Sequence, residues 1–409
     1  MPDTPDLVVR NGHIATMVPT ASDPWGVVHD GLVAVRGEDI VWAGPEREAP
    51  EELRAAGAPS VDAAGGWITP GLIDAHTHIV FGGTRAAEFE RRLEGATYEE
   101  IARAGGGILS TVRATRGAAR DALIATAHRR MEVLVDHGCT TIEVKSGYGL
   151  DVETELGMLD VAREAGRRAG VSVSTTLLGA HAIPQEFEGD RSGYVDLVCN
   201  EMIPEAARRG LAEAVDAFCE AIAFTPSECR RVLETGIAHG MQARLHADQL
   251  SDSGGAALAA EVGARSADHL ECTSEQGVRA MAEAGTAAVL LPGAFHFLGE
   301  TRKPPVQALR DAGVPMVVAT DLNPGSSPLG SPLLAMHFAC TLYGLTPVEA
   351  LAGMTREAAR VLALPDRGRV GEGMRADLAC WDVESLAELP YWMGFNTCTA
   401  VVSGGVRVR

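Results

Sequence analysis

Apolar and polar residues alternate in short runs at both ends of the chain, whereas a longer rhythm governs the middle. Near the N-terminus the alternating runs are separated by glycine or asparagine, which is typical of short strands joined by turns. The predicted strands are Leu7–Arg10, His13–Thr16, Gly31–Arg36 and Asp39–Ala43, followed near the C-terminus by Asp377–Asp382 and Thr399–Arg409. We therefore expect residues 1–66 and 366–409 to form one small β-sandwich domain built from both ends of the chain.

Between residues 67 and 365, runs rich in Val, Ile and Thr alternate with amphipathic stretches rich in Ala, Arg and Glu. Four of these stretches predict helices: Ala118–His137, Thr154–Ala169, Pro226–His239 and Ser274–Ala284. The strand-like runs are Trp67–His78, Cys139–Lys145, Val171–Ala180, Ala214–Cys219, Gln242–His246, Ser266–Leu270, Ala287–Leu291 and Pro315–Thr320. Eight such units predict an α/β fold, a (β/α)8 TIM-like barrel over residues 67–365, whose active site is expected at the carboxyl ends of the strands.

Polar residues of the ligand or acid–base type close seven of these eight strands, although the strand interiors look apolar. The first strand ends in His76 and His78, and these side chains share a face because residues two apart in a strand point the same way. The other closing segments are Lys145–Gly149, His181, Cys219–Glu220, His246–Gln249, His269 and Asp321–Ser327. In a barrel, these residues meet at one rim.

Four of the closing residues form a plausible ligand set for one divalent or trivalent metal ion: His76, His78, His246 and Asp321. Three imidazoles and a carboxylate suit zinc or iron and leave a position open for water. A bound metal lowers the pKa of water to roughly 7, so the set predicts hydrolysis at a polarised carbonyl or amidine carbon. Asp321 is expected to act as general base and then acid. His269 either orients Asp321 or stabilises charge on the carbonyl oxygen.

Charge and cysteine usage exclude several classes of function. With 35 basic and 55 acidic side chains the net charge is −20, which disfavours nucleic acid or an anionic membrane as partner. No apolar run approaches the ~20 residues that cross a bilayer. Eight scattered cysteines without a CxxC pair, and a first segment without a secretory pattern, predict a reduced cytoplasmic protein. A homodimer is the default expectation for its assembly.

Several longer blocks carry a resemblance to a known group of enzymes. They are Pro70–His78, Phe81–Arg85, Glu143–Gly149, Leu178–His181, Leu245–Gln249 and Thr320–Ser327. With the histidine that closes strand six, these blocks resemble the amidohydrolase superfamily over nearly the whole chain. Within it they resemble the family that opens 4-imidazolone-5-propanoate to N-formimidoyl-L-glutamate in histidine degradation. The resemblance implies this reaction and a mononuclear zinc or iron site on the four ligands named above.

The resemblance also implies a set of substrate contacts: Arg85, Tyr148, His181, Gln249, Asn323, Gly325 and Ser326. Arg85 offers a planar fork that matches a propionate carboxylate, the basic group that an acidic protein needs inside its site. The alternative is an arginine paired with Glu88 or Glu90. Tyr148 and His181 have the groups to hydrogen-bond a flat ring, whereas ordinary turn chemistry also explains the segment from Asn323 to Ser326.

At two positions the chain differs from the residues typical of the superfamily, and both differences concern the reaction. Ring deaminases of the superfamily typically place a glutamate where this chain has Gln249, and an amide does not shuttle protons. Binuclear relatives usually bridge their metals with a carboxylated lysine on strand four, whereas Lys145 belongs to strand two. Cys219 and Glu220 on strand four leave a second ion open.

Two alternatives to this reading remain. One is another cyclic amidase or ring deaminase of the superfamily, and the other is a metal-dependent binding or scaffold protein without turnover. The connections over residues 82–117 and 182–212 are long enough to fold over the mouth as a lid, with the glycines at 105–107 supplying backbone freedom.

Overall fold

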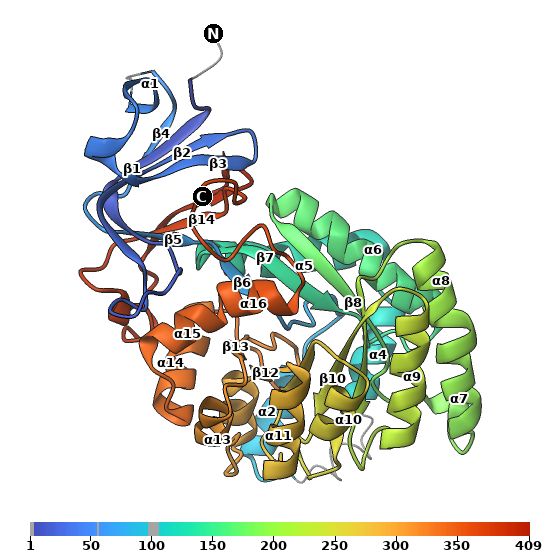
Figure 1. Ribbon diagram of the computed structural model, residues 1–409. Helices are drawn as coiled ribbons and strands as arrows, with labels where there is room; N and C mark the ends of the chain where they lie inside the picture. Colours follow the sequence, from blue (N-terminus) through green and yellow to red (C-terminus); the bar gives the residue numbers. More distant parts are fainter. Residues whose placement is uncertain (1–3, 55–56, 97–105) are drawn as a thin grey trace.

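Eight parallel strands form a barrel in the computed structural model, which describes residues 4–54, 57–96 and 106–409 (Figure 1). In order around the sheet they are β6 (Leu72–Asp74), β7 (Cys139–Lys145), β8 (Ser172–Ala180), β9 (Ala214–Cys219), β10 (Gln242–Ala247), β11 (Ser266–His269), β12 (Ala287–Leu290) and β13 (Met316–Val318). A parallel bridge between Thr77 and Leu322 joins the ends of the first and last strands. Thr320 also donates to the Asp74 carboxylate through its backbone N–H and its hydroxyl. The predicted barrel is confirmed.

Helices follow the strands and cover the outside of the barrel (Figure 1). Their bounds are α2 (Ala86–Leu93), α4 (Ile108–Arg116), α5 (Arg120–Asp136), α6 (Val152–Ala169), α7 (Arg191–Leu197), α8 (Ile203–Arg208), α9 (Pro226–Ala238), α10 (Gly255–Glu261), α11 (Glu275–Ala284), α12 (Pro292–Leu298), α13 (Val306–Asp311), α14 (Pro332–Tyr343), α15 (Pro347–Gly353) and α16 (Arg356–Val361). The four helices expected from amphipathic stretches are α5, α6, α9 and α11. Among the described residues, none of the helices is both long and apolar enough to cross a membrane.

Local sequence explains where these helices begin and end, and the apolar faces explain what they cover. Asp151 caps α6 by accepting a hydrogen bond from Thr154 N, and Gly170 ends it in the left-handed conformation. Leu134 of α5 and Leu159 of α6 are fully buried in one apolar cluster that also contains Val144 of β7. The helices therefore bury one stripe against the strands, as the period of about 3.6 residues requires.

A second, mixed sheet is made from both ends of the chain (Figure 1). Its strands are β1 (Leu7–Ala15), β2 (Val27–Arg36), β3 (Asp39–Pro45), β4 (Ser60–Asp62), β5 (Trp67–Pro70), β14 (Leu378–Trp381), β15 (Cys398–Ser403) and β16 (Val406–Arg407), and the short helix α1 (Glu51–Arg54) precedes β4. Val9, Val33, Leu378 and Val402 are buried in one cluster, so the two ends share a core. We propose that this sheet is a small domain of its own, with boundaries near residues 66 and 366.

The run Trp67–His78, predicted as one strand, is divided between the two sheets. Its first part, β5, pairs with β1 and β14, and its second part, β6, pairs with β7 of the barrel. Gly71 lies between them, where an added Cβ would stand 2.3 Å from Thr140 atoms. The chain thus passes from one sheet to the other at a point where only glycine fits, and His76 and His78 lie beyond the strand.

One further segment differs from the expected elements. The predicted strands Leu7–Arg10 and His13–Thr16 form the single strand β1, interrupted by a bulge where Asn11 has a φ of 59°. The expected glycine run includes Gly105, which lies outside the described residues, so the lid stays a prediction.

Candidate active site

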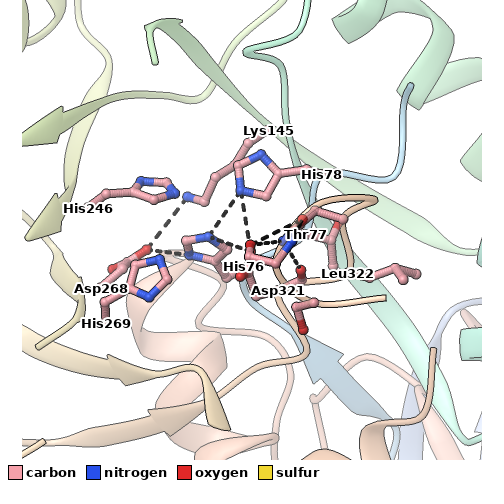
Figure 2. Close-up of polar contacts among 12 residues, drawn as sticks. His76, Thr77, His78, Lys145, His246, Asp268, His269, Asp321 and Leu322 are labelled. Atoms are coloured by element: carbon pink, nitrogen blue, oxygen red, sulfur yellow. Dashed lines mark hydrogen bonds and ion pairs between the residues drawn. The ribbon is translucent and has the colours of Figure 1, made fainter. Parts of the chain in front are cut away.

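The four predicted metal ligands lie together at one rim of the barrel (Figure 2). The Nε2 atoms of His76 and His78 are 3.3 Å apart, and Asp321 Oδ1 lies 3.5 Å from each of them. The ring of His246 is centred 4.6 Å from that of His76. His269 joins this group, because one ring nitrogen each of His76, His246 and His269 lie within 4.8 Å of one another. All five side chains are almost completely buried.

The donor atoms of this cluster fit a metal ion. Burial, with Lys145 nearby, lowers the pKa of His76 well below its usual range, and burial does the same for His78, so both imidazoles are neutral. Because His76 Nδ1 donates to Asp268 Oδ2 over 2.6 Å, its Nε2 keeps a lone pair that faces the Nε2 of His78. Two such nitrogens 3.3 Å apart beside a carboxylate are a donor set that divalent ions of the zinc and iron type accept.

His246 and Asp321 complete the cluster. Burial alone would lower the pKa of His246, but the Asp216 carboxylate, 3.0 Å from its Nδ1, reverses the shift and raises the pKa. Burial raises the pKa of Asp321 to about 7. Asp321 is therefore easier to protonate than an exposed aspartate, which suits a group that accepts and returns a proton.

The backbone at the rim holds two of these residues in the left-handed region. His269 has a φ of 81° and Asp321 a φ of 53°, conformations that cost free energy for residues with a Cβ. Asp321 N donates to His76 O, and His78 N donates to Leu322 O, both over 3.0 Å. These crossed bonds tie the end of β13 to the end of β6 and hold Asp321 next to the two histidines.

Three carboxylates behind the ligands were not predicted from the sequence. Glu143, Asp216 and Asp268 lie inside β7, β9 and β11, where the strand interiors were expected to be apolar, and all three are fully buried. Their charge is met by Lys145, whose Nζ lies 3.1 Å from Glu143 Oε1 and 2.9 Å from Asp216 Oδ2. Acidic residues inside strands that are buried along their whole length were the available signal.

A cavity of about 580 Å³ opens above the cluster. Its walls include His78, His246, His269 and Asp321 of the cluster. They also include all seven residues predicted to contact substrate: Arg85, Tyr148, His181, Gln249, Asn323, Gly325 and Ser326. The barrel therefore brings together residues that lie far apart in the sequence, and their contacts with a ligand stay predictions.

His181 and Tyr148 stand on one side of the cavity, where Glu155 organises the loop after β7. Glu155 accepts hydrogen bonds from the backbone of Gly147, Gly149 and Leu150. His181 Nδ1 lies 3.0 Å from Gly147 O and donates to it, which leaves Nε2 as an acceptor. Burial lowers the pKa of His181 to about 4, so the ring is neutral at physiological pH.

Arg85 and Asn323 are engaged within the protein as well as lining the cavity. Arg85 Nε donates to Glu88 Oε2 over 2.8 Å, which is the pairing weighed as the alternative. Asn323 Nδ2 donates to Asp321 O over 2.7 Å, and its Oδ1 accepts from Gly325 N and Ser326 N over 2.8 Å. The Asn323 amide therefore builds the turn after Asp321, and Arg85 is a cation in the cavity wall beside Glu88.

The residues considered for a second metal ion have other partners. Glu220 accepts from Leu250 N over 2.8 Å and from Ser251 N over 3.2 Å, which fixes the loop that carries Gln249. Burial opposes the charge of Lys145, but Asp216, Glu143 and Asp268 outweigh it and raise the pKa of this lysine above its usual range. Lys145 is therefore an ammonium group.

Glu271 gives the site a pH-dependent stability. Burial raises its pKa to about 8 from an ordinary value of 4.5, and its Oε2 lies 3.9 Å from His269 Nδ1. Between these pH values the native chain holds a proton that the unfolded chain has lost. The stabilising contribution is therefore fully present below pH 4.5 and is lost as the pH rises through about 8.

Glu271→Gln cannot titrate, so it should gain stability relative to wild type as the pH rises from about 5 to 8, by on the order of 1 kcal/mol per pH unit. Denaturant unfolding of both proteins across this range measures the difference. A difference that stays constant with pH would contradict the raised pKa.

Comparison with known proteins agrees with this arrangement. The model of the amidohydrolase family matches residues 67–408. The imidazolonepropionase of Caulobacter vibrioides (strain NA1000 / CB15N) is 56% identical over 402 residues, which cover 98% of this chain and 99% of the relative. The imidazolonepropionase of Shewanella oneidensis is 53% identical over 405 residues, 99% of each chain.

Solved structures share the fold at low identity. The zinc complex of atrazine chlorohydrolase from Arthrobacter aurescens is similar with a TM-score of 0.70 and 16% identity, over 98% of this chain and 94% of that chain. An adenosine deaminase from Xanthomonas campestris with bound zinc has a TM-score of 0.72 and 19% identity, over 100% of this chain and 93% of that chain. From the family match and the close relatives, the chain belongs to the amidohydrolase family and, within it, to the imidazolonepropionases.

Proposed function

We propose that this chain hydrolyses 4-imidazolone-5-propanoate to N-formimidoyl-L-glutamate, a step of histidine degradation. The observation that carries the proposal is the convergence of His76, His78, His246 and Asp321 at the base of a cavity that Arg85 also lines. The names of relatives more than half identical over nearly the full chain support the same reaction. The substrate has a flat ring and an anionic arm. These match a cavity that has the ligand cluster at its floor and the guanidinium of Arg85 in its wall.

Zinc or iron is the ion we propose for the four ligands. When bound, such an ion supplies a Lewis acid that lowers the pKa of water and polarises a carbonyl oxygen. Asp321 takes the proton of the attacking water, whose oxygen forms a bond to the ring carbonyl carbon. As the C–N bond opens, Asp321 returns the proton to the departing ring nitrogen, so no net proton is consumed. His269 lines the same cavity as Asp321 and stabilises the charge that develops on the carbonyl oxygen.

The remaining residues orient the ring. Arg85 binds the propionate through its guanidinium fork, with Glu88 holding the opposite edge. His181 accepts a hydrogen bond at Nε2 because its Nδ1 is committed to Gly147. Tyr148 and Gln249 complete the polar contacts around the ring. Gly325 and Ser326 lie in the cavity wall, where the Ser326 hydroxyl contacts the product carboxylate.

Gln249 separates this reaction from the deaminase alternative. Its neutral amide offers hydrogen bonds but cannot carry a proton between water and an exocyclic nitrogen. Asp321, a buried carboxylate beside His76 and His78 in the cavity wall, is the group suited to both proton transfers of a ring opening. Ring opening is therefore favoured over release of ammonia. A proton acceptor at the ligand cluster also favours an enzyme over the binding or scaffold protein without turnover.

Incubation of the purified chain with 4-imidazolone-5-propanoate tests the proposal, with elemental analysis of the same preparation. We expect N-formimidoyl-L-glutamate as the product, no free ammonia, and zinc or iron bound to the protein. Ammonia release with an intact ring would support the deaminase. Binding of the compound by metal-loaded protein without turnover would support the scaffold alternative.

For the cellular setting we propose a cytoplasmic homodimer. The eight cysteines are all free, which suits a reducing compartment. Tyr391, Trp392, Met393 and Phe395 are exposed together after β14, and they are a candidate surface for contact with a second copy. The net charge of −20 argues against nucleic acid as a partner.

A further inference from the structure

Lys145 occupies an unusual position in this chain. Lysine and arginine together number 35, and only Lys145 and Lys303 are lysines. Lys303 is exposed, whereas Lys145 is completely buried in the middle of the barrel. An ammonium group is a compact point charge with three donors, and a guanidinium is a larger planar fork. The one buried lysine therefore marks a place where a compact cation is required.

The Lys145 ammonium contacts three buried carboxylates. Its Nζ lies 2.9 Å from Asp216 Oδ2, 3.1 Å from Glu143 Oε1 and 3.7 Å from Asp268 Oδ2. The side chains of all four residues are at most 1% exposed. Buried carboxylates repel one another strongly at low dielectric, so a cation among them fixes where each one stands.

Each of these carboxylates leads to a different part of the ligand cluster. Asp268 Oδ2 accepts from His76 Nδ1 over 2.6 Å, and Asp216 Oδ2 lies 3.0 Å from His246 Nδ1. Glu143 Oε2 accepts from Thr77 N over 3.3 Å, between the two histidines that follow β6. Figure 2 shows Lys145 next to His76, His78, His246 and Asp268.

We propose that Lys145 is the positioning residue of the metal centre. Its ammonium fixes the positions of three carboxylates. Two of them orient the rings of His76 and His246, and the third holds the backbone at Thr77, so one side chain pre-organises three parts of the site. Groups that orient metal-ligating histidines typically account for a 10–100-fold difference in metal affinity. The inference rests on the metal site proposed above and deepens it.

The affinity for zinc, measured by competition with a chelator of known strength, tests this role apart from catalysis. Lys145→Met removes the charge with little change of volume and should bind zinc about 10–100-fold more weakly than wild type. Lys303→Ala, at the exposed lysine, should bind zinc as wild type does. Lys145→Ala should recover part of the lost affinity when ethylammonium is added, because the small cation can enter the vacated space. A folded Lys145→Met with wild-type zinc affinity would overturn the proposal.

If the lysine variants fail to fold, Asp268→Asn and Asp216→Asn test the carboxylates that contact His76 and His246 directly. Each should weaken zinc binding about 10–100-fold. Adding Lys145→Met to Asp268→Asn should cost less than it does in the wild-type background, since both act on His76. Wild-type zinc affinity in both asparagine variants would refute the proposal that Lys145 acts on the ligands through these carboxylates. A wild-type chain that bound no zinc or iron would instead overturn the proposed metal site.

Discussion

Asp321→Asn should lower kcat by about a thousandfold or more, because general acid–base catalysis alone typically contributes 10²–10⁴-fold. Asparagine has nearly the shape of aspartate but no group that accepts a proton and returns it. Asp321 Oδ1 stands 3.5 Å from both His76 Nε2 and His78 Nε2, so the change also removes an anionic donor from the ligand cluster. Steady-state kinetics with 4-imidazolone-5-propanoate, on protein of known metal content, measures the loss.

The matched control is Asp252→Asn, which makes the same change at an exposed aspartate and should leave kcat unaltered. Folding of Asp321→Asn should be intact, since burial already raises the pKa of the native carboxyl to about 7 and a neutral amide avoids the cost of burying the charge. Substrate affinity should change less than kcat, because the proton transfers belong to the transition state. If metal-loaded Asp321→Asn retained more than about a tenth of wild-type kcat, Asp321 would not be the proton carrier.

The barrel could be predicted because its strands are short apolar runs separated by helices with a clear amphipathic period. Parallel strands place their carboxyl ends at one rim, so His246 and Asp321 could be assigned to one site although they lie far apart in sequence. By the same rule Tyr148, in the segment that closes the second strand, lies in the wall of the same cavity, whereas Arg85 was assigned only from the resemblance. The four candidate ligands converge because the fold brings the strand ends together, and their binding of a metal stays a prediction.

The carboxylates that surround the ligands could not be predicted in the same way. Asp216 interrupts an otherwise apolar strand, and Asp268 lies between Ala267 and His269 in a short one. A hydrophobic pattern cannot show that a buried lysine compensates these two carboxylates. The division of the first predicted strand was also hidden. The pairing of β5 with β14 joins distant segments, and the sequence of Trp67–His78 gives no local sign of it beyond Gly71. Interactions between distant polar groups are where sequence patterns stop being informative.

Arg85→Met should raise KM for 4-imidazolone-5-propanoate by about 100–20,000-fold, with a much smaller change in kcat. The guanidinium binds the propionate in substrate and transition state alike, so its loss weakens binding uniformly. Each hydrogen bond to a charged group is worth about 1.5–3 kcal/mol, so a bidentate pair is worth about 3–6 kcal/mol. Every 1.4 kcal/mol corresponds to about a tenfold change in affinity, which gives this range. The measurement is the KM of the variant compared with that of wild type.

Glu88 makes the effect of Arg85→Met larger than the loss of two hydrogen bonds. Its Oε2 is bound to Arg85 Nε over 2.8 Å, while its Oε1 accepts from Gly107 N and Ser110 Oγ over 3.0 Å. Without the arginine, this carboxylate stays in place and repels the propionate. The double variant Arg85→Met/Glu88→Gln should therefore recover part of the lost affinity, which a purely structural Arg85 would not predict.

Arg92→Met is the matched control, because Arg92, on the helix α2 that follows Arg85, lines the same cavity but stacks over the Phe297 ring at 4.8 Å. Its KM should stay near the wild-type value. A substrate analogue with a primary amide in place of the carboxylate should bind wild type and Arg85→Met about equally, since it carries no charge for the guanidinium to meet. An unchanged KM for the propanoate in Arg85→Met would contradict the role of Arg85 in binding the propionate. A raised KM in Arg92→Met would assign that role to Arg92.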